Sequence, residues 1–301
     1  MIEKKRILIS GYYGFYNAGD EAVLSSLIAE IRKKSADIDI EALSADPKET
    51  SAAYGVTAIP RMSYRAVMDA INRCDMLISG GGSLLQDVTS MKSLIYYLSV
   101  IKMALYKKKK VFICAQGIGP LNRSISRKMS ASVLNKTSAI TVRDAGSAEL
   151  LKNIGVRKPE ITVSADPALL IEPADNESVD RLLAEIGIEP DEDIIAVSLR
   201  NWEVAGLKDT LAKALGDISA EIPARFLFIN MHMPHDKSIS EYAAGYVKNA
   251  AVQPRIWTPA ELAGVFGRCG LVTGMRLHAL ILAAAAGTPS IGISYDPKVE
   301  Q

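Results

Sequence analysis

Apolar and polar residues follow each other along this chain in a pattern typical of strands that alternate with helices. Short apolar runs are separated by longer stretches in which apolar residues recur every three or four positions. In the first half, the runs predict strands at 6–10, 38–43, 76–79, 111–115 and 139–142. The intervening stretches predict helices at 21–34, 64–73, 90–106, 124–136 and 145–153. Such alternation predicts parallel sheets with helices on both faces.

A polar segment at 171–178 separates this series from a second one. It contains one proline and reads as a linker. Beyond it, we predict strands at 194–199, 226–230, 255–257, 271–273 and 290–293, again with helices between them. The chain therefore predicts an α/β fold with two doubly wound domains, 1–172 and 178–301. A cleft between two such domains is the usual place for a small-molecule site.

The last residues, 295–301, show no finishing helix pattern. We therefore expect the second domain to be shortened at its C-terminus.

Composition and charge narrow the class of protein. Hydrophobic residues make up 49% and charged residues 23% of the 301 residues, as in ordinary globular proteins. A net charge of +1 argues against a general nucleic-acid binder, which would be distinctly basic. The three cysteines lie in or beside apolar segments and form no Cys-x-x-Cys, so we expect reduced, buried thiols in a cytosolic protein. The sequence shows neither a signal segment at its start nor an apolar run of transmembrane length.

The tripeptide Arg276-Leu277-His278 is the strongest candidate for chemistry. It follows the apolar run 270–272 and precedes a helix pattern at 279–287 that ends in glycine. Ligands of open α/β sheets bind at the carboxyl ends of strands, and helix N-termini attract anions. A fixed cation and an imidazole at such a turn indicate an anionic substrate whose reaction moves a proton. A helix cap, or a pair with a nearby carboxylate, is the structural alternative.

Glycine-rich loops follow three predicted strands. Gly80, Gly81 and Gly82 can present backbone N–H groups to an oxygen-rich ligand, and 116–120, which begins with Gln116, repeats the arrangement. The first loop, 11–21, lacks the spacing of the dinucleotide-binding fingerprint, so we do not predict dinucleotide binding. Its Asp20 either caps the following helix or orients an acceptor hydroxyl.

Two further arginines end predicted strands. Arg143 either pairs with its neighbour Asp144 or supplies a second cation for a dianion, and Arg200 either joins the anion site or is surface charge. His232, His235 and Asp236 resemble a loose metal set. No further ligand is spaced to complete it, so we predict no metal site.

The segment 94–110 is an apolar, tyrosine-bearing helix pattern that ends in four lysines, Lys107 to Lys110. Lysines suit a helix C-terminus, and this is the simpler interpretation. The alternative is a basic helix end that touches an anionic membrane surface.

Several of these segments together resemble the polysaccharide pyruvyl transferase family. They are Gly14-Phe15-Tyr16-Asn17-Ala18-Gly19-Asp20-Glu21, Ser79-Gly80-Gly81-Gly82, Gln116-Gly117-Ile118-Gly119-Pro120, Val142-Arg143-Asp144, Ala165-Asp166-Pro167-Ala168-Leu169 and Gly274-Met275-Arg276-Leu277-His278. The resemblance covers nearly the whole chain. In particular, the sequence is similar to bacterial cell-wall ketal-pyruvyl transferases that modify a lipid-linked ManNAc-GlcNAc disaccharide.

This resemblance implies a fold, a reaction and partners. The fold would be GT-B-like, with two Rossmann-like domains facing across a cleft. The donor would be phosphoenolpyruvate, and the product a 4,6-linked pyruvate ketal on the ManNAc of a lipid-diphosphate-linked disaccharide, as in the secondary cell-wall polymers that anchor S-layer proteins. The enzyme would need no cofactor, would not bind nucleic acid, and would be cytoplasmic, with peripheral contact at the cytoplasmic membrane face.

The chemistry suggests a role for each candidate residue. Arginine forks suit the phosphate and the carboxylate of phosphoenolpyruvate, so we expect Arg276, with Leu277 beside it, and Arg143 to bind the donor. His278 would transfer protons and Asp20 would orient the acceptor. The loop residues Gly80, Gly81, Gly82, Gln116 and Arg200 would line the substrate site.

Two other functions remain open from the sequence. One is a glycosyltransferase of the same fold that uses a nucleotide-sugar, and this would need a base-binding pocket and a diphosphate loop in the second half. The other is a non-enzymatic binding module for acidic glycans, in which His278 would affect affinity only.

Overall fold

The computed structural model describes residues 4–202 and 204–294, so the end predicted to be unfinished, 295–301, lies outside the described residues. The chain divides into two compact units. The first comprises residues 1–15 and 23–167, and the second comprises residues 16–22 and 168–301. A short segment near the N-terminus thus belongs to the unit that is otherwise built from the C-terminal half.

The first unit contains a seven-stranded sheet in which all neighbouring strands are parallel. The strand order is β3-β2-β1-β4-β5-β6-β7. The strands are β1 (Lys5–Ser10), β2 (Ile38–Ser44), β3 (Thr57–Pro60), β4 (Met76–Gly80), β5 (Lys110–Gln116), β6 (Ala139–Val142) and β7 (Ile161–Val163). Apolar runs of this kind suit strands that are covered on both faces.

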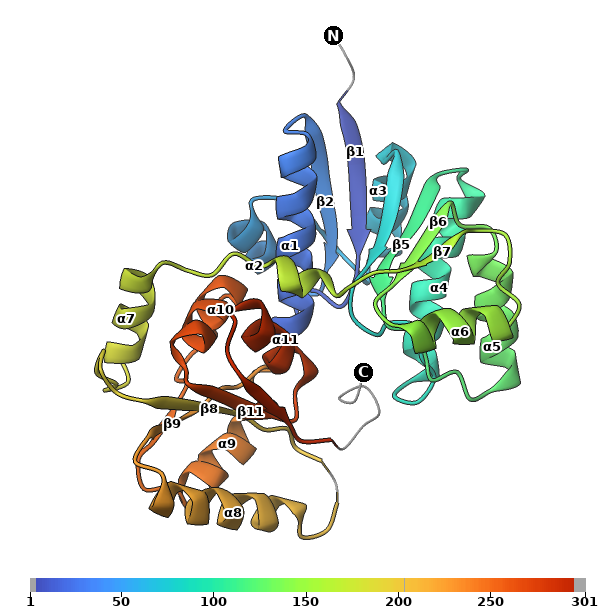
Figure 1. Ribbon diagram of the computed structural model, residues 1–301. Coiled ribbons are helices and arrows are strands. Elements are labelled where there is room, and N and C mark those ends of the chain that lie inside the picture. Colours follow the sequence, from blue (N-terminus) through green and yellow to red (C-terminus); the bar gives the residue numbers. More distant parts are fainter. Residues whose placement is uncertain (1–3, 203, 295–301) are drawn as a thin grey trace. The chain divides into compact units, whose positions relative to one another are not determined.

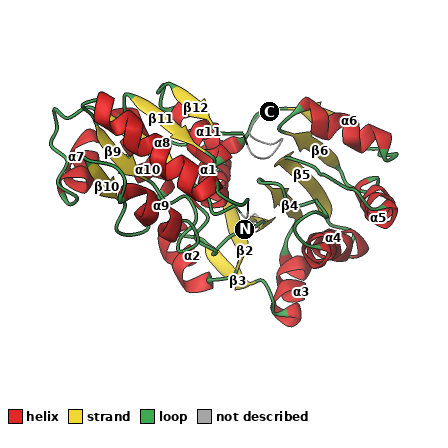
Figure 2. Cartoon of the chain, turned by 90° about the horizontal axis from the view of Figure 1, so that it is seen from below, coloured by secondary structure: helices red, strands yellow, loops and turns green. Residues whose placement is uncertain are grey.

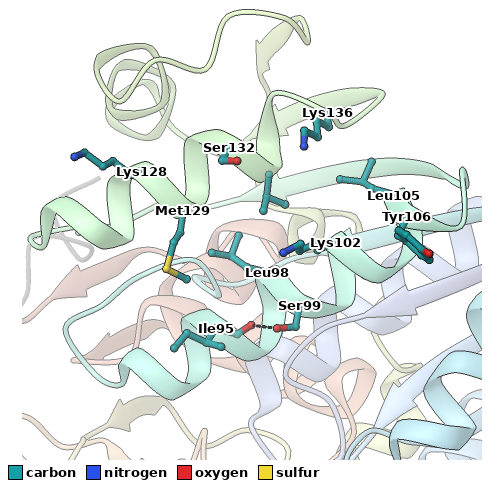
Figure 3. Close-up of a pocket in the computed structure, with 11 residues that line it drawn as sticks. Ile95, Leu98, Ser99, Lys102, Leu105, Tyr106, Lys128, Met129, Ser132 and Lys136 are labelled. Atoms are coloured by element: carbon teal, nitrogen blue, oxygen red, sulfur yellow. Dashed lines mark hydrogen bonds between the residues drawn. The ribbon is translucent and has the colours of Figure 1, made fainter.

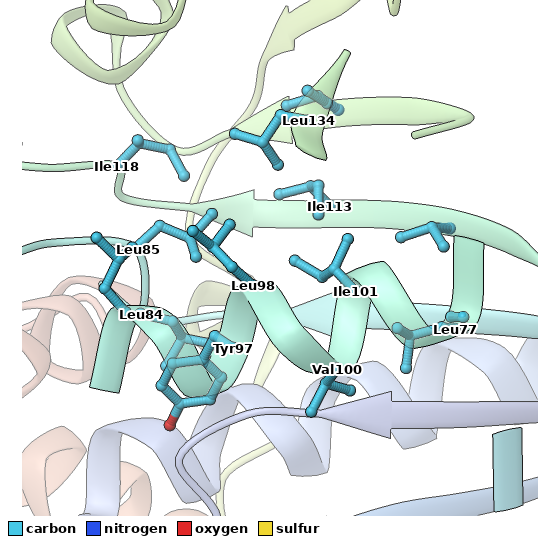
Figure 4. Close-up of a cluster of buried hydrophobic side chains, with 14 of the residues drawn as sticks. Leu77, Leu84, Leu85, Tyr97, Leu98, Val100, Ile101, Ile113, Ile118 and Leu134 are labelled. Carbon is cyan, nitrogen blue, oxygen red and sulfur yellow. The ribbon is translucent and has the colours of Figure 1, made fainter. Parts of the chain in front are cut away.

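Helices cover both faces of this sheet. They are α1 (Ala18–Lys34), α2 (Pro47–Tyr54), α3 (Tyr64–Arg73), α4 (Met91–Tyr106), α5 (Ser124–Leu134) and α6 (Ala145–Asn153). Figure 2 shows α3, α4 and α5 along one side of β4 and β5. In Figure 4, Leu98 and Ile101 of α4 face Ile113 of β5 within one buried cluster. This packing fixes the strand ends from which the loops of the unit start.

A buried arginine holds the loop that follows β1. Arg61 is only 7% exposed, and its guanidinium donates to the carbonyl of Gly11 and the hydroxyl of Tyr97, at 3.1 and 3.2 Å. The same group lies over the rings of Phe15 and Tyr96, 5.0 and 4.4 Å from their centroids. Such cation–π contacts stabilise a cation that is removed from water. They anchor the first glycine loop to α4.

The second unit contains a five-stranded parallel sheet with the order β10-β9-β8-β11-β12. The strands are β8 (Ile194–Ser198), β9 (Arg225–Phe228), β10 (Ala250–Val252), β11 (Leu271–Gly274) and β12 (Ser290–Gly292). The helical elements are the 3-10 helix η1 (Pro167–Leu170), α7 (Asn176–Ala184), α8 (Leu207–Glu221), α9 (Lys237–Ala244), α10 (Pro259–Arg268) and α11 (Leu277–Ala285). Helices α8 and α9 pack on one face of this sheet, and α10 and α11 lie on the other (Figure 1).

Both sheets reverse their strand order at equivalent places. The chain moves outward from β1 to β3 and then returns to the other side of β1 with β4, and it does the same from β8 to β10 and back with β11. These reversals are topological switch points, where open α/β sheets bind ligands at the carboxyl ends of the strands. The predicted α/β class with two doubly wound parallel sheets is confirmed. The loops after β1 and β4, and those after β8 and β11, are the natural places for a site.

Three strand predictions need correction. The residues 255–257 form no strand, and the outer strand is Ala250–Val252. We missed Thr57–Pro60, which ends in a proline, and Ile161–Val163, in which two of the three residues are exposed. Both are edge strands, where hydrophobic patterning is weakest.

All three cysteines are free, as expected from their spacing. Cys74 and Cys269 are buried, and Cys114 is half-buried. Burial raises the pKa of Cys114 to about 11 and that of Cys269 to about 12. Both thiols therefore stay protonated and weakly nucleophilic at neutral pH.

Candidate active site

The turn between β11 and α11 places the Arg-Leu-His tripeptide as the pattern predicts. β11 ends at Gly274 and α11 begins at Leu277, so Arg276 is the residue before the helix and His278 lies in its first turn. The side chain of Arg276, at the cap position, makes no capping hydrogen bond to α11. A helix N-terminus at a switch point favours an anion there.

Arg276 is held by a buried carboxylate in the same unit. Its Nε donates to Oδ2 of Asp236 at 3.0 Å, and its Nη2 donates to Oδ1 of the same residue. The side chain of Arg276 is 15% exposed and that of Asp236 is 1% exposed. The remaining N–H groups of the guanidinium have no hydrogen-bond partner among the residues that the structure describes. The pair fixes the orientation of the fork and leaves one edge for a ligand.

Asp236 receives a third hydrogen bond, from the backbone N–H of His232 at 2.9 Å. Burial raises the pKa of Asp236, while its bonds to Arg276 and the backbone N–H of His232 oppose that rise. The charge of Arg200 also lowers the pKa of Asp236, which places Arg200 within electrostatic reach of the pair. Arg200 follows β8 and lies over the ring of Trp202, 4.9 Å from its centroid. Two arginines from the two sides of the β8–β11 switch point therefore act on one buried carboxylate.

The N-terminal segment 16–22 is tied to the loop that carries His232. Asn17 and His232 form an antiparallel bridge. The N–H of Ala18 donates to the carbonyl of Met231 at 2.8 Å, and the N–H of Met233 donates to the carbonyl of Tyr16 at 3.2 Å. These backbone bonds bring the start of α1 beside the residues that support Arg276.

Gly19 lies against the imidazole of His278. A methyl group added at Gly19 would overlap Nδ1 and the adjacent ring carbon of His278. Only glycine allows so close an approach of backbone to this ring. Gly19 was not among the predicted site residues, although its place in the Asn-x-Gly-Asp-Glu segment was a signal for it.

Asp20 is not the helix cap that one interpretation predicted. α1 begins at Ala18, and the side chain of Asn17 accepts the N–H of Gly19 at 3.2 Å, so Asn17 occupies the cap position. Asp20 lies in the first turn and is 8% exposed. A carboxylate in a first helical turn is favoured by the helix dipole.

In the first unit, the loop after β4 is shaped by its glycines. Gly81 and Gly82 have positive φ angles of 67° and 64°, which side-chain-bearing residues adopt rarely. A methyl group at Gly81 would overlap Val23 of α1. The N–H of Gly81 already donates to the carbonyl of Cys114 at 3.1 Å, so this donor is not available to a ligand.

Gln116 is fully buried at the end of β5. Its Nε2 donates to the hydroxyl of Ser79 at 2.8 Å, and its Oε1 accepts no hydrogen bond from the described residues. This contact braces the β4 and β5 loops against each other.

Arg143 forms a buried pair that parallels the one at Arg276. Its Nη1 donates to Asp166 at 2.9 Å and its Nη2 to the hydroxyl of Ser83 at 3.1 Å. The two charged side chains are 8% and 4% exposed. The local pair with Asp144 that we considered is wrong, because Asp144 instead caps α6 through the N–H of Ser147. Each unit therefore fixes one strand-end arginine with a buried aspartate.

His232 and His235 do stack edge to face, with ring centroids 4.5 Å apart. Within the described part of the chain, however, His, Cys, Asp and Glu side chains do not gather in groups of three or more that could hold a metal ion. The carboxylate of Asp236 instead accepts hydrogen bonds from the side chain of Arg276 and the backbone N–H of His232.

Known proteins resemble this chain over most of its length. The family model described as polysaccharide pyruvyl transferase matches residues 17–297. The amylovoran biosynthesis protein AmsJ of Erwinia amylovora is 20% identical, and the alignment covers 97% of this chain and 84% of AmsJ.

Solved structures share the fold at low identity. The UDP-GlcNAc 2-epimerase from Methanocaldococcus jannaschii superposes with a TM-score of 0.65 at 15% identity, over 95% of this chain and 82% of the epimerase. A family 9 glycosyl transferase from Veillonella parvula gives 0.51 at 11% identity, over 97% and 82% of the two chains. The fold is accordingly GT-B-like. With a family match that extends over nearly all its residues, this chain belongs to the polysaccharide pyruvyl transferase family.

Proposed function

We propose that this transferase moves the pyruvyl group of phosphoenolpyruvate onto a sugar of a lipid-linked cell-wall glycan and releases phosphate. The observation that carries the proposal is the turn after β11, where a fixed guanidinium and an imidazole flank the N-terminus of α11. The acceptor would be the ManNAc of a ManNAc-GlcNAc-diphospho-lipid, which would receive a 4,6-linked ketal. The product would belong to a secondary cell-wall polymer of the kind that anchors S-layer proteins.

The donor is a small dianionic ester, and the site suits it. Arg276 would bind the phosphate or the carboxylate through the edge that Asp236 leaves open. The N–H groups of α11, including that of Leu277, would add partial positive charge. Arg143 stays a predicted ligand of the second anionic group, and its pair with Asp166 gives it a similarly fixed orientation.

The reaction requires two proton removals and one proton delivery. A proton is added to the methylene carbon of phosphoenolpyruvate while a sugar hydroxyl attacks the adjacent carbon and loses its proton. The C–O bond to phosphate then breaks, the second hydroxyl attacks the same carbon, and its proton leaves with the phosphate as hydrogen phosphate. We assign these transfers to His278, because an imidazole can both accept and donate a proton. Asp20 would orient the acceptor hydroxyl.

These steps involve proton transfer and phosphate displacement alone, so we propose no cofactor beyond the co-substrate. We place the reaction in the cytoplasm. Because a lipid-linked acceptor is anchored in a bilayer, the reaction would take place at the inner membrane face. No helix in the described residues combines the length and apolar character needed to cross a membrane.

The direct test is release of phosphate from phosphoenolpyruvate by the full chain, with the lipid-diphosphate disaccharide as acceptor. We expect release that depends on acceptor and a product heavier by one pyruvate ketal in mass spectrometry. Phosphate release without acceptor, or a product without the ketal, would contradict the proposal.

A nucleotide-sugar-dependent glycosyltransferase is the second candidate, because a solved glycosyl transferase shares the fold. Measuring the melting temperature with each donor distinguishes the pyruvyl transferase from the glycosyltransferase. We expect phosphoenolpyruvate to raise the melting temperature and UDP-sugars to leave it unchanged. The reverse result would favour the glycosyltransferase.

The contact between Gly19 and His278 supports a further prediction. In Gly19→Ala, the added methyl group must displace the imidazole, so phosphate release should fall at least tenfold while the protein stays folded. Gly267→Ala is the matched control, because a methyl group there meets only Ala286, at 3.7 Å, and should not alter turnover. Equal activities of the two variants would show that the position of His278 is unimportant.

A further inference from the structure

A groove between α4 and α5 of the first unit has no role in the site described above. It has a volume of about 550 Å³. Figure 3 shows side chains from both helices around it, with Leu98 and Leu105 of α4 on one side and Met129 of α5 on the other. Its apolar lining residues are Ile95, Leu98, Leu105, Tyr106, Met129 and Val133. The groove is thus apolar inside.

Three lysines border this apolar interior. Lys102 lies within α4, Lys128 lies within α5, and Lys136 follows α5 (Figure 3). None of them forms an ion pair with another described residue. A helix-end role explains Lys107 to Lys110, but it does not explain lysines inside two helices that face one groove.

The charge of the whole chain is distributed unevenly around this groove. Residues 88–143 contain eleven Lys and Arg residues and no Asp or Glu. Since the full chain has a net charge of only +1, all other residues together have ten more acidic than basic side chains. Such segregation creates a local positive field that attracts an anionic surface.

Exposed apolar side chains accompany this charge. Tyr106, at the end of α4, is 83% exposed. Ile95 lies about three turns earlier on the same face of this helix and is 44% exposed. A helix face that combines lysines with exposed apolar and aromatic residues is typical of binding in the membrane interface.

We propose that the α4–α5 groove and its lysines bind the surface of a bilayer that contains anionic phospholipids. The lysines contact headgroup phosphates, and Ile95 and Tyr106 insert at the headgroup boundary. This inference deepens the proposed function, because a lipid-linked acceptor lies in such a bilayer. Binding to the surface nevertheless requires neither donor nor acceptor and can be measured without them.

The test is co-sedimentation of the full chain with vesicles of phosphatidylcholine alone or mixed with phosphatidylglycerol. We expect binding to the mixed vesicles only, and weaker binding at high salt. Each lysine near an anionic surface contributes about fivefold to partitioning, so Lys128→Gln/Lys136→Gln should weaken binding about 30-fold. The matched control is Lys48→Gln/Lys213→Gln, which removes two exposed lysines on α2 and α8 and should leave binding unchanged.

A second variant tests the apolar part. Ile95→Ser/Tyr106→Ser changes no charge and should also reduce vesicle binding, with an unchanged melting temperature. The proposal is overturned by absent binding, by equal binding to both kinds of vesicle, by equal effects of the two lysine pairs, or by capture of soluble heparin in preference to vesicles. Phosphate release with a disaccharide acceptor that lacks the lipid reports on the proposed reaction separately.

Discussion

Replacing His278 by glutamine should reduce phosphoenolpyruvate turnover by about 10²- to 10⁴-fold, the range that positioned proton transfer contributes. Glutamine keeps the size and hydrogen-bonding capacity of the side chain but does not exchange protons near neutral pH. Arg276 and the N-terminus of α11 remain, so the affinity for phosphoenolpyruvate should change little. Steady-state phosphate release and calorimetric titration of the donor measure the two effects separately.

His235→Gln is the matched control for this prediction. His235 lies in the same unit and is exposed, and its ring contacts that of His232. Its replacement should leave turnover near the wild-type value. If His278→Gln keeps full turnover, then His278 has no part in the chemistry. A change in affinity alone would instead favour the glycan-binding alternative.

Replacing Asp236 by alanine should lower the free energy of unfolding of the second unit by about 3–5 kcal/mol, because it leaves the Arg276 guanidinium buried without its counter-charge. The guanidinium of Arg276 also loses the two hydrogen bonds that orient it. Donor affinity should therefore fall as well, even though no proposed donor ligand is removed. Urea denaturation measures the first effect, and calorimetric titration the second.

Asp175→Ala provides the comparison for Asp236. Asp175 is an exposed aspartate of the same unit that caps α7 through the N–H of Ser178. Its loss should destabilise the protein less and leave donor affinity unchanged. A similar loss of stability in both variants would show that the buried Arg276–Asp236 pair contributes no more than an exposed helix cap.

Local patterns in the sequence predicted most of the fold. Strands such as Ala139–Val142 and helices such as Tyr64–Arg73 and Ala145–Asn153 lie where hydrophobic spacing places them. The errors fall on strands of three or four residues at sheet edges and on the missed short helix α2, where few side chains are buried and periodicity has too few positions to show.

Within the candidate site, the sequence identified the strand-end arginines but not what holds them. Arg276 and Asp236 are 40 residues apart, and Arg143 and Asp166 are 23 residues apart. Such pairs depend on how strands are ordered in the sheet, which no local pattern encodes. The same reasoning explains why the sequence did not identify Gly19 as a site residue. Its contact with His278 requires backbone pairing between residues 16–18 and 231–233.

The membership of residues 16–22 in the second unit limits how this protein can be recombined. A chimera joined at residue 168 would combine the C-terminal half of one relative with the heptapeptide of another. The glycine beside the imidazole and the backbone partner of Met231 would then come from a foreign parent. Exchanging one unit between relatives therefore requires two crossovers near the start of the chain and one near residue 168, so that the heptapeptide is inherited together with residues 168 onward.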